Sequence, residues 1–247
     1  MVELITNKVF LEDDYEIREY NTENGIVRAL ISNECTQSLM YMDKDKRQEL
    51  GLDYFKFYNI SIDLNPNGTN YLMLGGGGFS YPQYYLNKYK HKNIDVVEVN
   101  EKCVEYAKKY FYLDELIDYS KDRLNIIIDD AINYIKNTNK QYDYILIDLF
   151  NGRNPVKEIY NEENLNNLKR ILKYNGIILI NYIIENDNYN EELNKIIQLT
   201  SNYKIITSNK YFNNINKKGN IIIILSNNII KIPVFYEYID VSNLIKS

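Results

Sequence analysis

The sequence is poor in the residues that build metal clusters, disulfide scaffolds and histidine-based active sites. Its 247 residues include only two cysteines, Cys35 and Cys103, and a single histidine, His91. Two cysteines cannot form a disulfide framework, and one histidine cannot complete the usual zinc site of four Cys and His ligands, so we expect no metal. His91 lies among lysines, where a solvated turn is expected rather than the base of a nucleophilic triad. Catalytic chemistry would therefore depend on carboxylates, amides and backbone groups.

The sequence also lacks an excess of basic residues and a long hydrophobic run. Lys and Arg total 29 against 34 for Asp and Glu, and this net charge of -5 is not typical of a general nucleic-acid binder. The longest apolar runs, such as 221–225, are far shorter than the roughly 20 residues that cross a bilayer. No basic stretch precedes an apolar one at the start, and free cysteines are typical of a reducing compartment. We therefore expect a cytoplasmic protein that has neither nucleic acid nor membrane as a partner.

Hydrophobic residues make up 45% of the chain, enough for a packed core. From residue 71 onward, apolar runs that predict buried strands alternate with segments of helical periodicity. Strands are expected at 71–74, 94–99, 124–128, 142–147, 176–184 and 220–225, and helices at 101–111, 162–172 and 193–200. This alternation predicts an α/β fold with a mostly parallel sheet and helices on both faces.

The first 66 residues have a different character. Asn24-Gly25 is a hairpin turn signal before β-forming residues at 26–32, and another extended piece is expected at 38–42. The turn cluster at 65–68 is the expected boundary. We therefore predict a small β-rich N-terminal domain over residues 1–66 and a larger sheet domain over residues 67–247.

Two candidate binding features follow the first two strands of the larger domain. Open α/β sheets bind their ligands at the carboxyl ends of strands. Gly75, Gly76, Gly77 and Gly78 follow the first strand, where glycine lets the backbone approach a ligand with its N–H groups free, although such a turn is also compatible with a purely structural role. Glu98 ends the second strand, at the spacing where a carboxylate accepts ribose hydroxyls. The alternative for Glu98 is a solvated acid at a strand end.

Two further acids follow the next strands. Asp130, with Ala131 behind it, is placed to accept a hydrogen bond from an adenine amino group, to cap the following helix, or to do both. Asp148 lies between a buried strand and a loop, where it would accept a proton from a nucleophile or act as a turn former. Ser80 occupies the place of the third glycine in a dinucleotide fingerprint, so an S-adenosyl compound fits better than a nicotinamide dinucleotide.

The order of these motifs resembles the spermidine synthase family. Gln37-Ser38 is similar to the family's N-terminal Gln motif, the segment 74–78 to its glycine loop, and 97–100 to its ribose-binding strand. Asp130-Ala131 resembles its adenine-side acid, and 142–148 resembles the strand that ends in its catalytic Asp. The resemblance implies a class I S-adenosylmethionine-dependent methyltransferase-like (Rossmann-like) sheet behind a small N-terminal β-domain.

The resemblance also implies ligands, roles and partners. The co-substrate would be decarboxylated S-adenosylmethionine or S-adenosylmethionine, and the second substrate a small amine or polyamine. Asp148 would be the catalytic base, while Gln37, the glycine loop, Glu98 and Asp130 would hold the nucleoside. A homodimer is implied as well. Its interface would use the β-rich N-terminus and an apolar tail that otherwise completes the sheet: Ile229, Ile230, Ile232, Val234 and Phe235.

The sequence departs from the family pattern at the amine end of the site. Gly78 replaces an acid that holds the aminopropyl ammonium, and Asn151 replaces a second acid three residues after the catalytic Asp. The residues that grip the polyamine have no clear counterpart in 53–56. These departures resemble a spermidine-synthase-like branch and leave three functions open. They are aminopropyl transfer, methyl transfer from intact S-adenosylmethionine, and a non-catalytic nucleoside-binding or assembly module.

Overall fold

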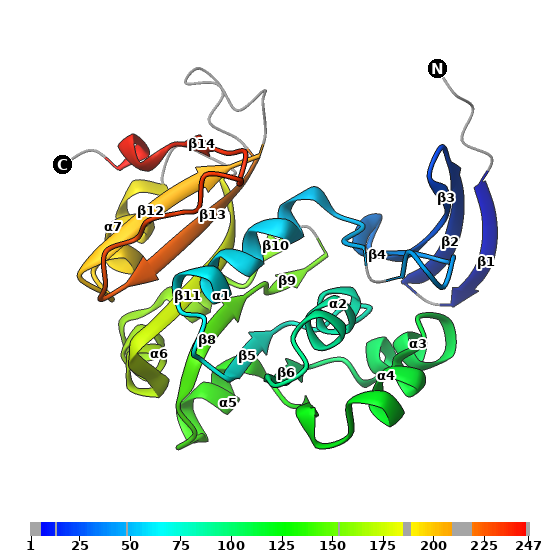
Figure 1. Ribbon diagram of the computed structural model, residues 1–247, viewed down its shortest axis with the longest axis horizontal. Helices are drawn as coiled ribbons and strands as arrows, with labels where there is room; N and C mark the ends of the chain where they lie inside the picture. The colour runs from blue at the N-terminus through cyan, green and yellow to red at the C-terminus, as the bar shows by residue number, and fades with distance from the viewer. Residues whose placement is uncertain are drawn as a thin grey trace.

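Two sheets of different character lie beside each other in the chain. In the computed structural model, which describes residues 6–12, 14–47, 49–152, 154–184, 189–208 and 219–245, an eight-stranded mixed sheet forms the body and a four-stranded antiparallel sheet lies at one end (Figure 1). Both the α/β architecture and the N-terminal β sheet were expected from the sequence.

The N-terminal sheet is a meander of four strands in sequential order. They are β1 (Thr6–Glu12), β2 (Tyr15–Thr22), β3 (Gly25–Ser32) and β4 (Cys35–Tyr41). The hairpin expected at Asn24-Gly25 joins β2 to β3, and the Thr22 hydroxyl donates a hydrogen bond of 2.7 Å to the Gly25 carbonyl. Ile17, Leu30 and Met40 pack against helix α3 (Glu101–Tyr110) of the larger part. The small sheet therefore shares its core with helix α3, which lies on one face of the large sheet.

The large sheet has the strand order β14-β12-β13-β11-β8-β5-β6-β7. Its strands are β5 (Asn70–Leu74), β6 (Asn93–Glu98), β7 (Leu124–Ile128), β8 (Tyr142–Ile147), β11 (Leu172–Ile184), β12 (Asn202–Thr207), β13 (Gly219–Ser226) and β14 (Ile239–Asp240). Five neighbouring strands pair in parallel, in the order β7, β6, β5, β8 and β11. Strand β13 pairs antiparallel with β11 and β12. All six residues of β8 are buried, because both faces of a parallel sheet are covered. The strands predicted from residue 71 onward are thus confirmed.

Helices cover both faces of this sheet (Figure 1). One face carries α5 (Ala131–Asn137), α6 (Glu162–Ile171) and α7 (Tyr189–Ile197); the other carries α1 (Ile60–Leu64), α2 (Ser80–Lys88), α3 and α4 (Leu113–Ser120). Short elements complete the fold: η1 (Asp53–Asn59), η2 (Lys121–Arg123), η3 (Lys157–Tyr160), η4 (Ser242–Leu244), and the two-stranded pair β9 (Phe150–Asn151) and β10 (Asn154–Pro155). Within the described residues, none of the helices combines the length and apolar character that crossing a membrane requires.

The stretch between β4 and β5 differs from the β-rich character expected for it. It contains η1 and α1, whose buried Phe57, Tyr58 and Ile60 join the core under β5 and α2. Aromatic and β-branched residues favour strands, but here burial against the large sheet decides the local structure. The domain boundary at residues 66 and 67 remains a prediction.

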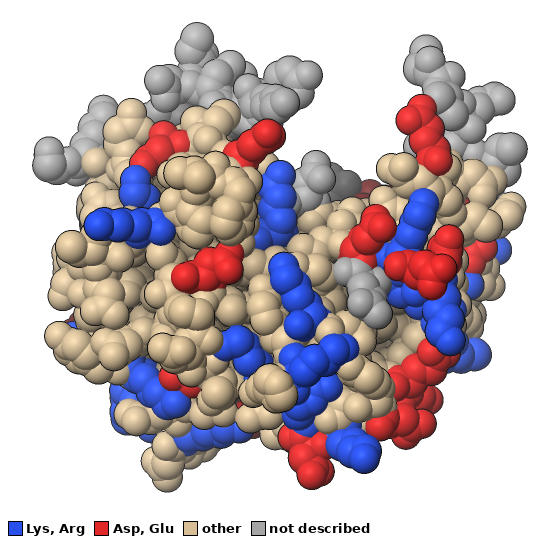
Figure 2. Space-filling model, viewed as in Figure 1, with Lys and Arg blue, Asp and Glu red and all other residues tan. Residues whose placement is uncertain are grey.

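Figure 2 shows charged side chains of both signs on one face of the molecule, with a group of Lys and Arg side chains near the centre of the view and acidic ones gathered at the lower right. His91 lies exposed in a turn, as its polar neighbours predict. The described residues also contain no group of three His, Cys, Asp or Glu side chains arranged to hold a metal ion.

Candidate active site

Two adjoining cavities open where the parallel strands end. The larger has a volume of about 460 Å³ and the smaller about 400 Å³. Residues from both sheets line the two cavities together: Gln37, Gly75, Gly77, Asp148, Phe150 and Gly152. Most of the site residues predicted from the sequence therefore converge on this region.

The glycine loop is bound to the carboxylate of Glu98. The N–H groups of Gly76 and Gly77 donate to Glu98 Oε2 at 2.9 and 3.2 Å, and the Asn100 N–H donates to Oε1 at 2.9 Å. Gly75 has a φ of +93°, and a Cβ there would lie 2.2 Å from the Asp148 carbonyl oxygen. Only glycine allows this close approach without displacement of the backbone after β8. Glu98 is thus a buried, fixed acceptor on the wall of the smaller cavity.

Asp130 caps helix α5 at the rim of the smaller cavity. Its Oδ1 accepts hydrogen bonds from the N–H groups of Ile132 at 2.9 Å and Asn133 at 3.0 Å. The capping role predicted from the sequence is confirmed, and the exposed side chain still borders the cavity. Ala131 is the buried first residue of the helix and lines the same cavity.

The N-terminal sheet contributes to the smaller cavity through Tyr15, a residue that the sequence analysis missed. The Tyr15 hydroxyl accepts a hydrogen bond of 2.5 Å from Asn100 Nδ2 and lies 3.3 Å from the Cys103 sulfur. Burial raises the pKa of Tyr15 well above its usual range, and burial with the nearby Glu98 charge raises the pKa of the Cys103 thiol to about 12. Both groups are therefore neutral at physiological pH. No local sequence signal marks Tyr15, since its partners are 85 and 88 residues away.

Asp148 lies at the junction of the two cavities. Its backbone N–H donates to the Leu74 carbonyl at 3.0 Å, and its Oδ1 accepts a hydrogen bond of 2.8 Å from Asn181 Nδ2. Burial raises the pKa of the Asp148 carboxyl, while Asn181 and the nearby Tyr58 hydroxyl lower it. A carboxylate with a raised pKa in a cavity is a candidate general base. Asn181 was missed from the sequence, although an amide inside the apolar strand 177–184 is a usable signal.

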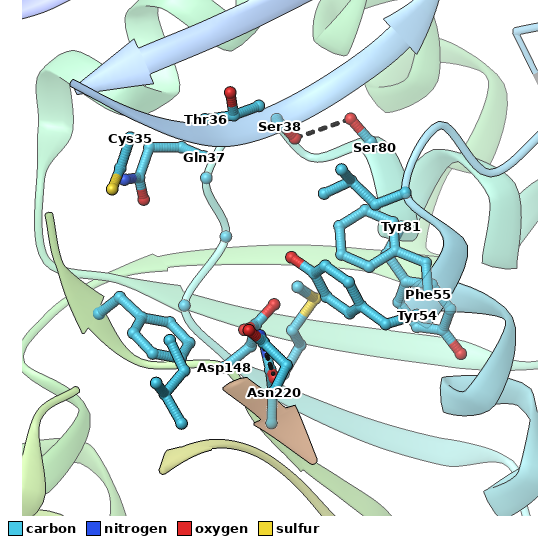
Figure 3. Close-up of a pocket in the computed structure, with 18 of the residues that line it drawn as sticks. Cys35, Thr36, Gln37, Ser38, Tyr54, Phe55, Ser80, Tyr81, Asp148 and Asn220 are labelled. Atoms are coloured by element: carbon cyan, nitrogen blue, oxygen red, sulfur yellow. Dashed lines mark hydrogen bonds between the residues drawn. The ribbon is translucent and has the colours of Figure 1, made fainter. Parts of the chain in front are cut away.

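The larger cavity has a mixed lining, with aromatic rings on one side and polar side chains on the other. Tyr54, Phe55 and Tyr81 form one side, facing Asp148 and Asn220 in Figure 3. Burial raises the pKa of Tyr54 well above its usual range, and the charge of Asp148 acts in the same direction. The family residues that grip the polyamine have no clear counterpart in the sequence of 53–56, yet Tyr54 lines this cavity.

Gly78 lies apart from the other three glycines, because it is not among the residues that line either cavity. A Cβ at this position would lie 2.7 Å from Ser38 Cβ and 3.0 Å from Ser38 Oγ. Ser38 is buried and its hydroxyl is 2.7 Å from that of Ser80, the contact drawn in Figure 3. Strand β4 thus occupies the space that a side chain at position 78 would need.

Comparisons with known proteins agree with these features. The spermine/spermidine synthase domain family matches residues 58–235. A polyamine aminopropyltransferase of Methanocaldococcus jannaschii is 30% identical over 122 residues, which cover 49% of this chain and 41% of that protein. The polyamine aminopropyltransferase of Vibrio vulnificus is 26% identical over 188 residues, covering 74% of this chain and 58% of the relative. The chain therefore spans about half the length of the curated relatives it matches.

Solved structures share the fold at low sequence identity. A probable spermidine synthase from Corynebacterium glutamicum has a TM-score of 0.72 and 19% identity, with coverage of 89% of this chain and 79% of that chain. Human methyltransferase-like protein 13 in complex with SAH has a TM-score of 0.60 and 20% identity, with coverage of 72% and 83%. These likenesses confirm the methyltransferase-like sheet. With the family match over most of the chain, they establish that it belongs to the spermine/spermidine synthase domain family.

Proposed function

We propose that the chain transfers an aminopropyl group from decarboxylated S-adenosylmethionine to an amine acceptor. Membership of the family and relatives named polyamine aminopropyltransferases support this activity over methyl transfer or a binding-only role. The observation that carries the proposal is the position of Asp148, an acid with a raised pKa at the junction of two cavities. A group-transfer enzyme needs donor and acceptor sites that meet at such a base.

The smaller cavity suits the nucleoside part of the donor. An ionised carboxylate offers about four lone-pair sites, and Glu98 uses three of them on backbone N–H groups. We assign the remaining site to a ribose hydroxyl, with Gly75, Gly76 and Gly77 beside the ribose. Asp130 keeps its capping bonds on Oδ1, and we assign Oδ2 to the adenine amino group.

The larger cavity suits the acceptor amine. The acceptor nitrogen attacks the sulfonium-bound carbon of the aminopropyl chain, the carbon–sulfur bond breaks, and its electron pair stays on sulfur in neutral methylthioadenosine. The attacking nitrogen loses its extra proton to Asp148. Tyr54, Phe55 and Tyr81 enclose the carbon chain of the acceptor. We place Gln37, which lines both cavities, beside the aminopropyl chain of the donor.

Calorimetry with four nucleosides tests the donor site. The ligands are decarboxylated S-adenosylmethionine, S-adenosylmethionine, methylthioadenosine and S-adenosylhomocysteine. We expect the two without a carboxylate to bind more tightly, and the Glu98→Ala variant to weaken both. A preference for the two carboxylate-bearing ligands would replace aminopropyl transfer with methyl transfer. If none of the four binds, the nucleoside site itself is wrong.

We also propose that the chain acts in the cytoplasm as a homodimer. In the C-terminal segment, Ile230 and Ile232 pack on the core, whereas Ile229, Val234 and Phe235 expose apolar side chains to solvent. Exposed apolar residues grouped in one short segment are suited to a subunit contact. Light scattering would show a mass near twice the 29.4 kDa of the chain, and a Val234→Ser/Phe235→Ser variant would reduce it to the monomer.

A further inference from the structure

A line of side-chain amides leads from Asp148 into the antiparallel half of the large sheet. Asn220 Nδ2 on β13 donates a hydrogen bond of 3.0 Å to Asn181 Oδ1 on β11, and Asn181 Nδ2 donates one of 2.8 Å to Asp148 Oδ1. The Thr207 hydroxyl on β12 donates a hydrogen bond of 2.9 Å to the backbone carbonyl of Asn220. Asn181, Asn220 and Asp148 all line the larger cavity.

The Asp148 carboxylate determines which group of each amide donates and which accepts. An ionised carboxylate only accepts hydrogen bonds, so Asn181 must turn its NH₂ group toward Asp148. Its carbonyl oxygen then faces Asn220 and requires a donor, which the Asn220 NH₂ group supplies. Asn181 is only 3% exposed, so an unpaired amide oxygen at this position would be costly. The Asn220 contact therefore selects the orientation of Asn181 that donates to Asp148.

We propose that Asn181 and Asn220 are a pair of positioning residues, in which Asn220 locks the Asn181 amide and Asn181 holds Asp148 as an oriented, proton-accepting carboxylate. The role of Asp148 as the base rests on the proposed function. The hydrogen-bonded geometry does not depend on that function. Because Asn220 does not contact Asp148 in any hydrogen bond of the described residues, its effect on Asp148 must pass through Asn181.

Among the described residues, none of the other titratable groups near Asp148 donates it a hydrogen bond of normal geometry. They are Tyr54 and Tyr58 from η1, Tyr71 from β5 and Tyr160 from η3, together with the Cys35 thiol on the cavity wall. Burial raises the pKa of all four tyrosines, so their hydroxyls stay neutral near pH 7 and place no negative charge beside the carboxylate. The Tyr58 hydroxyl acts on the Asp148 pKa but makes no hydrogen bond within normal geometry among the described residues. Asn181 is thus the donor held directly against the carboxylate.

The test compares Asn181→Leu, Asn220→Leu and the double variant in the full chain. Leu removes the amide at similar volume and adds no charge. We measure the Asp148 titration by ¹³C NMR of the carboxyl carbon, and the pH dependence of kcat and KM for aminopropyl transfer. The control is Asn202→Leu on β12, whose Nδ2 donates to the Asn227 carbonyl at 3.1 Å, outside both cavities.

We expect Asn181→Leu to increase the proton affinity of Asp148 about tenfold, the loss of one hydrogen bond to a charged group. Asn220→Leu should shift it in the same direction by a smaller factor, and the double variant should match Asn181→Leu alone. The acidic limb of the pH profile of kcat should move to higher pH, with KM little changed. Asn202→Leu should leave both the titration and the kinetics unaltered. If the variants shift the Asp148 titration while the wild-type chain shows no turnover, the proposed function is wrong but the positioning role of Asn181 and Asn220 is supported. Unchanged titration of Asp148 in both single variants, or additive shifts in the double variant, would overturn the inference.

Discussion

Asp148 and Glu98 are two carboxylates in one site with opposite surroundings. Glu98 accepts three backbone N–H groups, which suits a fixed acceptor for hydroxyl groups. Asp148 accepts one hydrogen bond from a side-chain amide and lies among tyrosines, and burial raises its pKa. Environments of this kind divide the roles of two acids, one a fixed hydrogen-bond acceptor and the other exchanging a proton.

Replacement of Glu98 by Gln tests the first of these roles. Gln keeps the shape but offers one accepting oxygen, so one set of contacts with the glycine loop or the ribose is lost. We expect the affinity for methylthioadenosine to fall about 10- to 100-fold, as for hydrogen bonds to a charged group. Calorimetry checks this, with the exposed Glu101→Gln as the matched control. Equal affinity of Glu98→Gln and the wild type would remove Glu98 from the binding site.

The pH dependence of stability tests the environment of Asp148. Because its folded pKa is raised, the native chain holds more protons than the unfolded chain between the unfolded and folded pKa values, and the free energy of unfolding decreases as pH rises through that window. Above the window, the charged carboxylate destabilises the fold. We expect Asp148→Asn to melt at a higher temperature than the wild type at pH 8, with a difference that shrinks toward pH 4. A calorimetric scan showing a lower melting temperature at pH 8 would contradict this.

Strand β4 and the glycine loop are in such close contact that each limits the sequence of the other. A Cβ at Gly77 would lie 3.2 Å from the Gln37 carbonyl oxygen, and one at Gly78 would contact Ser38. The family pattern has an acid at the place of Gly78, and in this chain Ser38 leaves no space for such a side chain. At this scale, the N-terminal sheet shapes the glycine loop beside the two cavities and does not merely flank it.

Restoring the family acid is consequently expected to harm the fold. Gly78→Asp places Cβ within 2.7 Å of Ser38 Cβ, and overpacking of this kind costs about 1–3 kcal/mol. Chemical denaturation should show this loss, and Ser38→Gly in the same chain should recover part of it. A Gly78→Asp variant as stable as the wild type, with tighter binding of decarboxylated S-adenosylmethionine, would show that the position does reach the ligand.

Tyr15 tests the contribution of the N-terminal sheet to the nucleoside site. Tyr15→Phe removes the hydroxyl that accepts a hydrogen bond from Asn100 and leaves the ring packing, so the half-buried Asn100 amide loses a partner. We expect methylthioadenosine to bind about 5- to 15-fold more weakly, as for a loss of about 1–1.5 kcal/mol. The control is Tyr106→Phe on α3, whose ring packs against that of Tyr15, because this change leaves the Tyr15–Asn100 hydrogen bond intact. Unchanged affinity of Tyr15→Phe would limit the small sheet to a structural role.

At the scale of the whole molecule, the sequence predicts the parallel sheet well because its central strands β5, β6 and β8 are buried on both faces and appear as apolar runs. It predicts a β-rich N-terminus but does not delimit β1 and β2, because their charged and mostly exposed or half-buried residues give no clear alternation. It also misses the helical turn of η1, where burial of aromatic residues overrides their strand preference. In the site, the acids at strand ends were predicted, but Asn181 and Asn220 were not, since their partners lie 33 and 39 residues away in the chain.

The most direct test of the account is product analysis with decarboxylated S-adenosylmethionine and a panel of amines, comparing the wild-type chain with Asp148→Asn. We expect release of methylthioadenosine with an aminopropylated amine, and a loss of about 10²- to 10⁴-fold in kcat for Asp148→Asn, as for removal of a general base. Equal turnover by the two chains, or S-adenosylhomocysteine from intact S-adenosylmethionine as the only product, would contradict it.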